Sequence, residues 1–283
     1  MANQHQHPEQ SEEEQQLRMQ QEMDLINNLN KIKYKIVVMS GKGGVGKSTV
    51  AANIAETFQK QGFKTGILDV DIHGPNIPKL MGTEGEKILV EDKKFIPVKN
   101  ESGIETMSIA YLLDAIDDAV IWRGPVKGGV IRQFIADVNW GNLDVLIIDN
   151  PPGTGDEPLT VFQSIPLIDA VVMVTTPNTL SQEDVLKSVK FARQMHNNKI
   201  GLVENMAYYI CPNCGEKLNI FGKNEGEKFS KELEIDFLGE IPLAEKISES
   251  ADSEKLVADD SSEISEKFNE IVNTIKDKYL TKD

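Results

Sequence analysis

Runs of consecutive apolar residues recur along most of this chain, and each is about the length of one strand. These runs predict buried strands at residues 36–39, 64–69, 104–110, 143–149, 170–177, 199–203 and 235–238. Strands that are apolar on both faces are typical of parallel sheets that helices cover on each side. The apolar pattern therefore indicates a sheet in the middle of the protein.

Between these strands, apolar residues are spaced three or four apart, which is the period of an amphipathic helix. This spacing predicts helices over residues 49–61, 126–138 and 181–195, and a last helix with a stripe of Ile264, Phe268, Ile271, Val272, Ile275 and Tyr279. Residues 84–103 mix Gly and Pro with charges, so we expect a loop or a small hairpin there. The alternation predicts an α/β fold, a three-layer, doubly wound and mostly parallel sheet with helices on both faces.

The loop between the first predicted strand and helix is rich in glycine and fits the pattern Gly-x-x-x-x-Gly-Lys-Ser/Thr. Its glycines let backbone N–H groups point inward, and the following helix N-terminus adds partial positive charge, so a triphosphate fits there. We expect Lys47 to reach the β- and γ-phosphates and Ser48 to bind Mg²⁺. The expected nucleotide-binding residues of this loop are Gly41, Lys42, Gly43, Gly44, Val45, Gly46, Lys47, Ser48 and Thr49.

Aspartates stand at the ends of two predicted strands, at the edge of the sheet where open α/β folds bind ligands. Asp69 ends the strand at 64–69, Asp71 follows it, and Asp149 ends the strand at 143–149. Phosphoryl transfer needs acids that support Mg²⁺ and orient the attacking water. We expect Asp69 and Asp149 to support hydrated Mg²⁺ and Asp71 to orient the water. For Asp69 and Asp71 the alternative is an ordinary turn or cap residue.

Two cysteines, Cys211 and Cys214, lie in the sequence Cys-Pro-Asn-Cys-Gly. Such a turn points both sulfurs at one ion, as in zinc ribbons and iron–sulfur sites. A closed tetrahedral site needs four thiolates, so two chains would have to share it, around either a 4Fe–4S cluster or a zinc ion. The alternatives are a redox-active dithiol and a pair without function. A dithiol of that kind should open a helix, whereas we expect a loop at residues 216–222.

Composition limits the partners. The chain has 283 residues, 40% hydrophobic and 27% charged, as in ordinary globular proteins. It has no run of eighteen apolar residues and no apolar signal-peptide core, so we expect a cytoplasmic protein. A net charge of −15 disfavours binding to nucleic acid or anionic membranes. Residues 1–30 are rich in Gln and Glu, so we expect a flexible extension before one ATPase domain at 31–283, with the cysteine turn at 211–214 inserted in it.

A second lysine makes the glycine-rich loop more specific. Lys42 follows the first glycine, and Lys-Gly-Gly-Val-Gly-Lys-Ser resembles the deviant Walker A motif of the MinD, ParA and nitrogenase iron-protein superfamily. In that superfamily the early lysine reaches across a dimer interface and stabilises charge on the partner's nucleotide during hydrolysis. The resemblance implies this role for Lys42. The alternative is a solvated loop lysine.

Most of the chain resembles one family within that superfamily, the Mrp/ApbC family of P-loop ATPases. The segments that carry the resemblance are 41–49, 69–78, 122–125, 149–156, 204–206, 211–215 and 239–243. The family is homodimeric, binds a labile 4Fe–4S cluster between its subunits and passes it to apo-proteins. The resemblance implies that Cys211 and Cys214 are cluster ligands, and that Lys42, Lys47 and Asp71 are catalytic.

The same resemblance bears on the base and on the partners. Asn205 follows a predicted strand and can offer a donor and an acceptor to an adenine edge, and Pro242 is expected at the nucleotide as well. The preference for ATP rests mainly on the family. The implied partners are a second copy, apo iron–sulfur proteins and cluster-assembly scaffold proteins. The alternatives are a MinD- or ParA-like positioning switch without a cluster, which the acidic composition disfavours, and a reductase like the nitrogenase iron protein.

Overall fold

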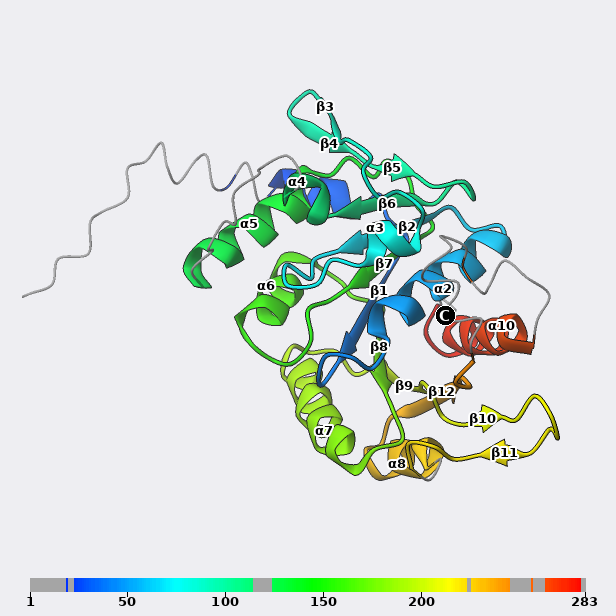
Figure 1. Cartoon of the computed structure of the whole chain (residues 1–283). Helices are drawn as coiled ribbons and strands as arrows, with labels where there is room; N and C mark the ends of the chain where they lie inside the picture. The colour runs from blue at the N-terminus through cyan, green and yellow to red at the C-terminus, as the bar shows by residue number, and fades with distance from the viewer. Residues whose placement is uncertain are drawn as a thin grey trace, which may run out of the picture.

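The computed structural model describes residues 19, 23–113, 124–222, 225–244, 256 and 263–280, with the backbone alone at 124–127 and 179–182. Trp122, Arg123 and most of the predicted N-terminal extension lie outside these residues. The main strands are β1 (Tyr34–Ser40), β2 (Thr65–Asp69), β5 (Val98–Lys99), β6 (Glu105–Ser108), β7 (Val145–Asp149), β8 (Ala170–Thr175), β9 (Ile200–Glu204) and β12 (Asp236–Glu240). They form one sheet in the order β12-β9-β8-β1-β7-β2-β6-β5 (Figure 1).

Every neighbouring pair of strands in this sheet is parallel except β5 with β6, so the mostly parallel α/β sheet is confirmed. The seven predicted strands are all present. β5 is an extra strand at the edge, within the segment expected to be a loop or hairpin. A two-residue strand has too little pattern to be recognised from the sequence, because period and length are the only local signals.

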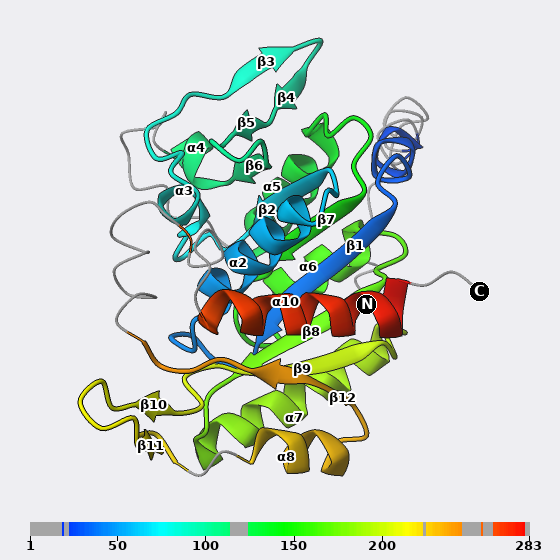
Figure 2. The same ribbon diagram turned by 90° about the vertical axis from the view of Figure 1, so that its right-hand side faces the viewer.

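Helices cover both faces of the sheet (Figures 1 and 2). On one face lie α2 (Lys47–Lys60) and α10 (Glu263–Ile275); on the other lie α5 (Gly124–Asp137), α6 (Asp156–Ser164) and α7 (Thr179–Gln194). β1 shows why helices must cover both faces of the sheet. Its side chains are all buried, with Ile36 and Val38 in the core under α2 and with Val37 and Met39 in the opposite core.

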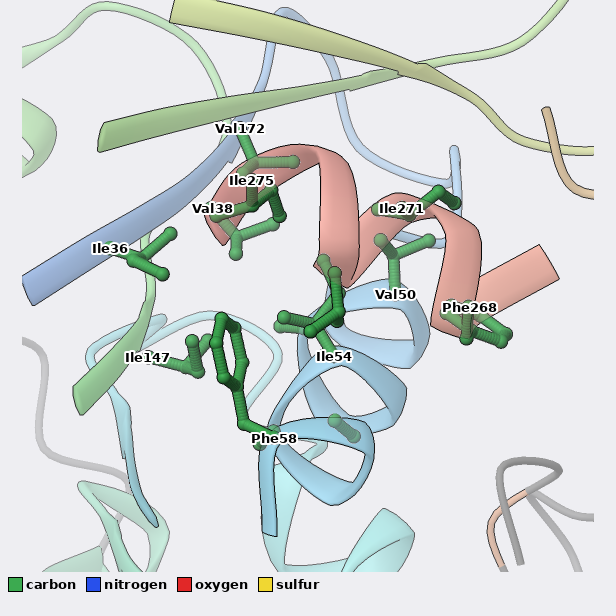
Figure 3. Close-up of a cluster of buried hydrophobic side chains, with 14 of the residues drawn as sticks. Ile36, Val38, Val50, Ile54, Phe58, Ile147, Val172, Phe268, Ile271 and Ile275 are labelled. Carbon is green, nitrogen blue, oxygen red and sulfur yellow. The ribbon is translucent and has the colours of Figure 1, made fainter. Parts of the chain in front are cut away.

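The apolar stripe on the last helix closes the core that lies between α2 and the sheet. Phe268, Ile271 and Ile275 of α10 pack with Val50 and Ile54 of α2 above the sheet (Figure 3). The chain then continues as a short π-helix, η2 (Lys276–Leu280), whose Tyr279 is buried in the same core. The predicted packing role of this stripe is confirmed.

Two small hairpins project from the sheet. One is β3 (Leu89–Glu91) with β4 (Lys94–Ile96), which is the hairpin expected at residues 84–103. The other is β10 (Tyr209–Ile210) with β11 (Lys217–Leu218), and it carries the two cysteines at its turn. The remaining short helices are α3 (Ile77–Leu80), α4 (Ala110–Leu113) and α8 (Gly226–Glu232).

Packed structure begins before residue 31, earlier than the expected boundary. Residues 23–29 are helical, and Leu25 and Leu29 are buried in the core on the α5 side. The Asn28 amide donates a hydrogen bond to the Val138 carbonyl, which ties this helix to the end of α5. The apolar spacing of Leu17, Met19, Met23, Leu25 and Ile26 predicts no more than a transient helix in this extension. The burial of Leu25 and Leu29 could not be predicted, because it depends on a distant surface. Among the described residues, no helix is long and apolar enough to cross a membrane.

Candidate functional site

A cavity of about 570 Å³ opens at the C-terminal edge of the sheet. Its walls come from the glycine-rich loop with the start of α2 and from the segments that follow β2, β7 and β9. These contribute, among others, Lys47, Asp71, Pro152 and Met206 respectively. In an open parallel sheet these loops meet at one edge, which is where such folds bind ligands. The structure thus brings together the glycine-rich loop and the acid that follows β2, which are far apart in the sequence.

The glycine-rich loop has the backbone form that a phosphate cradle needs. Gly44 and Gly46 have φ angles of 79° and 80°, in the left-handed region that favours glycine. Gly46 is the N-cap of α2 and offers no side-chain cap, so the first amides of that helix remain for a ligand. A Cβ at Gly46 would overlap the Asn205 amide, and one at Gly41 would lie 2.5 Å from the backbone of Asp184 in α7. Glycine is required at both positions for close packing.

Lys47 is buried between acids at the cavity floor. Its Nζ lies 2.5 Å from Asp149 Oδ1 and 3.7 Å from Asp71 Oδ2. Burial alone would lower the pKa of Lys47, but the hydrogen bond and charge of Asp149, with the charges of Asp71 and Asp69, raise it. Burial raises the pKa of Asp149, although the charge and the hydrogen bond of Lys47 act to lower it. The lysine is therefore charged, and it is held in place by acid groups.

Asp69 is fully buried and receives three hydrogen bonds from the protein. The Asp71 amide donates to its Oδ1 at 3.1 Å, and Ser108 Oγ and the Ile77 amide donate to its Oδ2 at 3.0 and 3.3 Å. Burial, followed by the charge of Asp149, raises the pKa of Asp69 to about 8. These bonds fold the loop after β2 around Asp69, so this carboxyl positions Asp71. Its predicted contact with hydrated Mg²⁺ stays a prediction.

The donor set fits a magnesium ion. Asp149 Oδ2 is buried without a hydrogen-bond partner, and Ser48 Oγ lies next to Lys47 Nζ, at 3.4 Å. A buried carboxylate oxygen without a donor is costly unless a cation or its water occupies the space beside it. Among the described residues, no group of three or more His, Cys, Asp or Glu side chains is gathered to hold a metal by itself. Mg²⁺ commonly keeps several waters and uses one or two protein ligands with phosphate, so this donor set suits it.

A contact between two loops was missed by sequence reasoning. His73, in the cavity wall after β2, pairs with Glu157 at the start of α6, with 3.2 Å between His73 Nε2 and Glu157 Oε1. The backbone amide of His73 also donates a hydrogen bond to Asp71 Oδ1 at 3.2 Å. The pair joins the loops that follow β2 and β7 beside the predicted water-orienting acid. Only the fold reveals it, because 84 residues separate the two side chains.

The residues predicted to contact the base, Asn205 and Pro242, are not among those that line the cavity. Asn205 is buried, and its Nδ2 donates to the Val45 carbonyl at 2.9 Å, so its donor holds the phosphate loop. Pro242 is buried near the end of β12. Met206, which sequence reasoning did not select, lines the cavity instead. The adenine contacts of Asn205 and Pro242 stay predictions.

Lys42 belongs to the phosphate loop but is not among the residues that line the cavity. Ser40 Oγ donates to its carbonyl at 2.8 Å, which fixes its backbone. Its side chain is half-exposed and makes no hydrogen bond or ion pair with the part of the chain that the structure describes. An ammonium in this setting is available to a group outside the subunit.

The cysteine turn has the geometry of a metal-binding knuckle. The Gly215 amide donates to the Cys211 carbonyl at 2.8 Å, and Gly215 has a φ of 73°, which explains the glycine. Amide hydrogen bonds from Asn213 and Cys214, and one from the Cys214 side chain, lower the pKa of the Cys211 thiol. Both thiols are free, Cys211 half-exposed and Cys214 exposed. No helix follows them, as expected, but the segment at residues 216–222 that was expected to be a loop contains the two-residue strand β11.

Exposed apolar side chains lie on the hairpin that carries this turn and just after it, and sequence reasoning missed them. Ile210 and Leu218 lie on the two strands of the hairpin, and Ile220 and Phe221 follow it; their exposed fractions are 37%, 39%, 55% and 48%. We call these four residues the apolar collar. Clustered exposed apolar residues mark interaction surfaces more often than scattered ones do. The hairpin and the phosphate loop lie at the same edge of the sheet (Figure 2).

Comparison with known proteins identifies the family. The family model described as ParA, NUBPL iron-transfer P-loop NTPase, matches residues 31–276. The chain belongs to this family. An iron–sulfur cluster carrier protein of Methanococcus maripaludis is 49% identical over 256 residues, which cover 90% of this chain and 89% of that protein. A protein of Dictyostelium discoideum named cytosolic Fe-S cluster assembly factor NUBP2 homolog is 45% identical over 226 residues, covering 78% of this chain and 84% of that one.

Solved structures agree with this assignment. The nucleotide-binding protein of Archaeoglobus fulgidus in complex with ADP superposes with a TM-score of 0.73 at 43% identity, covering 83% of this chain and 92% of that one. MinD of Aquifex aeolicus, at 20% identity and a TM-score of 0.63, covers 88% of this chain and 99% of that one and shares the fold. The family and the phosphate loop together make this protein a P-loop nucleotide hydrolase.

Proposed function

We propose that this protein binds and slowly hydrolyses ATP, and that it assembles a 4Fe–4S cluster at a homodimer interface and transfers it to apo-proteins. The observation that carries the proposal is the exposed Cys211–Cys214 knuckle at the same edge of the sheet as the phosphate loop. The names of the relatives, an iron–sulfur cluster carrier and an Fe–S cluster assembly factor, support the same cargo. The name of the second relative also supports a cytoplasmic location.

The cluster requires a second copy of the chain. Each subunit offers two thiolates, and a closed site for a cluster or a zinc ion takes four ligands. The amides around Cys211 stabilise its thiolate, which is the form that binds metal. The apolar collar supports burial of the knuckle against a partner subunit, because iron–sulfur ligation is protected when water is excluded.

The residues around the cavity support hydrolysis of a nucleoside triphosphate. The cradle of residues 41–49 and the Lys47 ammonium would bind the phosphates, and Ser48 with Asp149 would hold Mg²⁺, which neutralises charge on them. Asp71 lines the cavity. Its amide donates to Asp69, and its Oδ1 accepts a hydrogen bond from the His73 amide, so its carboxylate is held where it can orient the attacking water. Lys42 from the partner would stabilise the charge that develops on the phosphates.

The first experiment is anaerobic reconstitution of the full chain with iron and sulfide. We expect four irons and four sulfides per dimer, with loss of the cluster in Cys211→Ala and in Cys214→Ala while ADP binding is kept. Transfer from the loaded dimer to an apo 4Fe–4S enzyme would then be followed by recovery of that enzyme's activity. A protein that binds only zinc, or a cluster that both single variants retain, contradicts the proposal.

A further inference from the structure

We infer that residues 205–210 form a coupling segment, which links the phosphate loop to the cysteine hairpin so that a bound nucleotide restricts the motion of the two thiols. The inference rests on the proposed function for its cargo, but the coupling itself is a property of the metal-free chain. Asn205 precedes Cys211 by only six positions, and contacts fix the segment at its start, middle and end.

The start of the segment is bound to the phosphate loop. Asn205 Nδ2 donates to the Val45 carbonyl at 2.9 Å, and the Asn205 amide donates to the Thr175 carbonyl at 2.8 Å. The side chain is 4% exposed and packs directly against Gly46. A shift of the loop on nucleotide binding must therefore move Asn205 or break its hydrogen bond, because packed interiors leave no free space for it.

Met206 adds a direct contact with the cavity. It is one of the residues that line the cavity, and its φ of 54° lies in the left-handed region, which is uncommon for a side chain of this size. A backbone held in that region is retained only when the structure on both sides fixes it. Met206 thus contacts whatever occupies the cavity, and its backbone has little conformational freedom to compensate for a shift of Asn205.

The middle of the segment is held by the chain that follows β12. The Ala207 amide donates to the Ile241 carbonyl at 2.9 Å, and the Leu243 amide donates to the Tyr208 carbonyl at 2.7 Å. Ala207 and Tyr208 are 1% and 5% exposed. Both bonds join the segment to the same neighbouring stretch, which limits how far the segment can bend outward, so displacement at Asn205 is passed along the chain.

The end of the segment is joined to the hairpin through Lys217. Its Nζ lies 3.6 Å from the centre of the Tyr208 ring and 3.2 Å from Glu240 Oε1. Lys217 stands opposite Ile210 in the hairpin, and the Cys211 amide donates to the Glu216 carbonyl at 3.0 Å. The turn that holds both thiols is therefore attached to Tyr208 by two routes, the backbone and the lysine.

These contacts predict how a bound nucleotide changes the motion of the hairpin. A bound nucleotide holds the Val45 carbonyl in place, which stabilises the Asn205 hydrogen bond and makes opening of the hairpin rarer. Linkage also makes the coupling reciprocal: by whatever factor nucleotide changes the affinity of the thiols for a metal ion, the metal ion changes the affinity for nucleotide. Couplings of this kind commonly amount to about 5-fold or more.

The test measures alkylation of Cys211 and Cys214 by iodoacetamide in the full, metal-free chain, with and without saturating ADP, by mass spectrometry. In the wild type we expect ADP to slow alkylation about 5-fold. Asn205→Ala should lose this dependence at ADP concentrations that still saturate it. Lys217→Ala should lose most of it while its ADP affinity is unchanged, because Lys217 lies outside the cavity. Lys231→Ala is the matched control, since it removes a surface lysine paired with Glu227 on α8 and should retain the full effect.

Two results would overturn the inference: equal alkylation rates with and without ADP in the wild type, or full retention of the ADP effect in both Asn205→Ala and Lys217→Ala. The second result would be expected if nucleotide protected the thiols simply by driving dimerisation. Because the readout needs no cluster, failure of cluster reconstitution would leave the coupling intact. If the protein loads a cluster but ADP has no effect on alkylation, the coupling is disproved and the proposed function stands.

Discussion

Lys47 Nζ lies 2.5 Å from Asp149 Oδ1, so the lysine of the phosphate loop and the acid that ends β7 form a buried pair across the cavity floor. Asp149 ends β7, and Lys47 begins α2 after the loop that follows β1. Because β1 and β7 are neighbours in the sheet, the two residues meet although 102 positions separate them. The pair leaves Asp149 Oδ2 without a partner. It thus holds the lysine ready for phosphate while keeping a carboxylate oxygen available.

Removing the lysine charge should affect both binding and stability. In Lys47→Met, Asp149 and Asp71 lose their counter-charge inside the protein. Loss of one partner of a buried pair commonly costs about 3–5 kcal/mol, so the free energy of unfolding should fall by that order. Affinity for ADP should fall about 10- to 100-fold, since charged hydrogen bonds contribute about 1.5–3 kcal/mol. Urea denaturation and calorimetric titration measure the two effects.

Lys42→Met serves as the control for this prediction. Lys42 has no ion pair within the described part of the chain, so its loss should leave the urea midpoint within error of the wild type. Adding Asp149→Asn to Lys47→Met should restore part of the lost stability, because it removes the unpaired charge. Equal urea midpoints for Lys47→Met and the wild type would contradict the importance of the buried pair.

Two glycines of the phosphate loop should respond differently to the same substitution. Gly46→Ala places a Cβ against the Asn205 amide at a φ of 80°, whereas a Cβ at Gly43 meets nothing within 4 Å. The left-handed backbone alone costs about 1–2 kcal/mol for a residue other than glycine. We expect Gly46→Ala to lower both the melting temperature and the affinity for ADP, and Gly43→Ala to stay within about 0.5 kcal/mol of the wild type. Similar losses in both variants would show that the contact with Asn205 is unimportant.

The fold could be predicted because its information is local. Runs of apolar residues gave the seven strands of the sheet, and the glycine spacing gave the loop at residues 41–49 before any contact was known. The stripe on α10 was equally readable, since burial of one helix face leaves a period in the sequence. These features depend on residues close together in the chain.

Contacts between distant segments could not be predicted in this way. Asn205 was assigned to an adenine edge from its type and place, but its hydrogen bond to Val45 depends on how two loops meet 160 positions apart. The burial of Leu25 and Leu29 likewise depends on the surface beside α5. The apolar collar escaped notice because four apolar residues in a short hairpin show no period, and only their exposure marks them.

The two cysteines should be distinguishable by the pH dependence of alkylation. The pKa of Cys211 lies below its ordinary value because the amides of Asn213 and Cys214, and then the Cys214 side chain, donate hydrogen bonds to its sulfur. The thiolate is the reactive form, and its fraction rises as the pH passes the pKa. In metal-free Cys214→Ser, the alkylation rate of Cys211 should therefore reach half its maximum at a lower pH than free cysteine does. A midpoint equal to or above that of free cysteine would contradict the hydrogen bonds to the sulfur.

The apolar collar gives a prediction about the loaded dimer. Ile220→Ser and Phe221→Ser each remove an exposed apolar side chain just after the cysteine hairpin without changing either cysteine. Burial of such a side chain contributes about 1.5–3 kcal/mol, and a two-fold interface contains each position twice, so dimerisation should weaken about tenfold or more. Sedimentation of the reconstituted protein measures the dimer, and iron retention after dilution measures the cluster. Leu89→Ser removes an apolar residue that is 65% exposed on β3, away from the cysteine hairpin, and should leave both unchanged. Dimers of wild-type strength in both collar variants would show that the knuckle meets its partner without the collar.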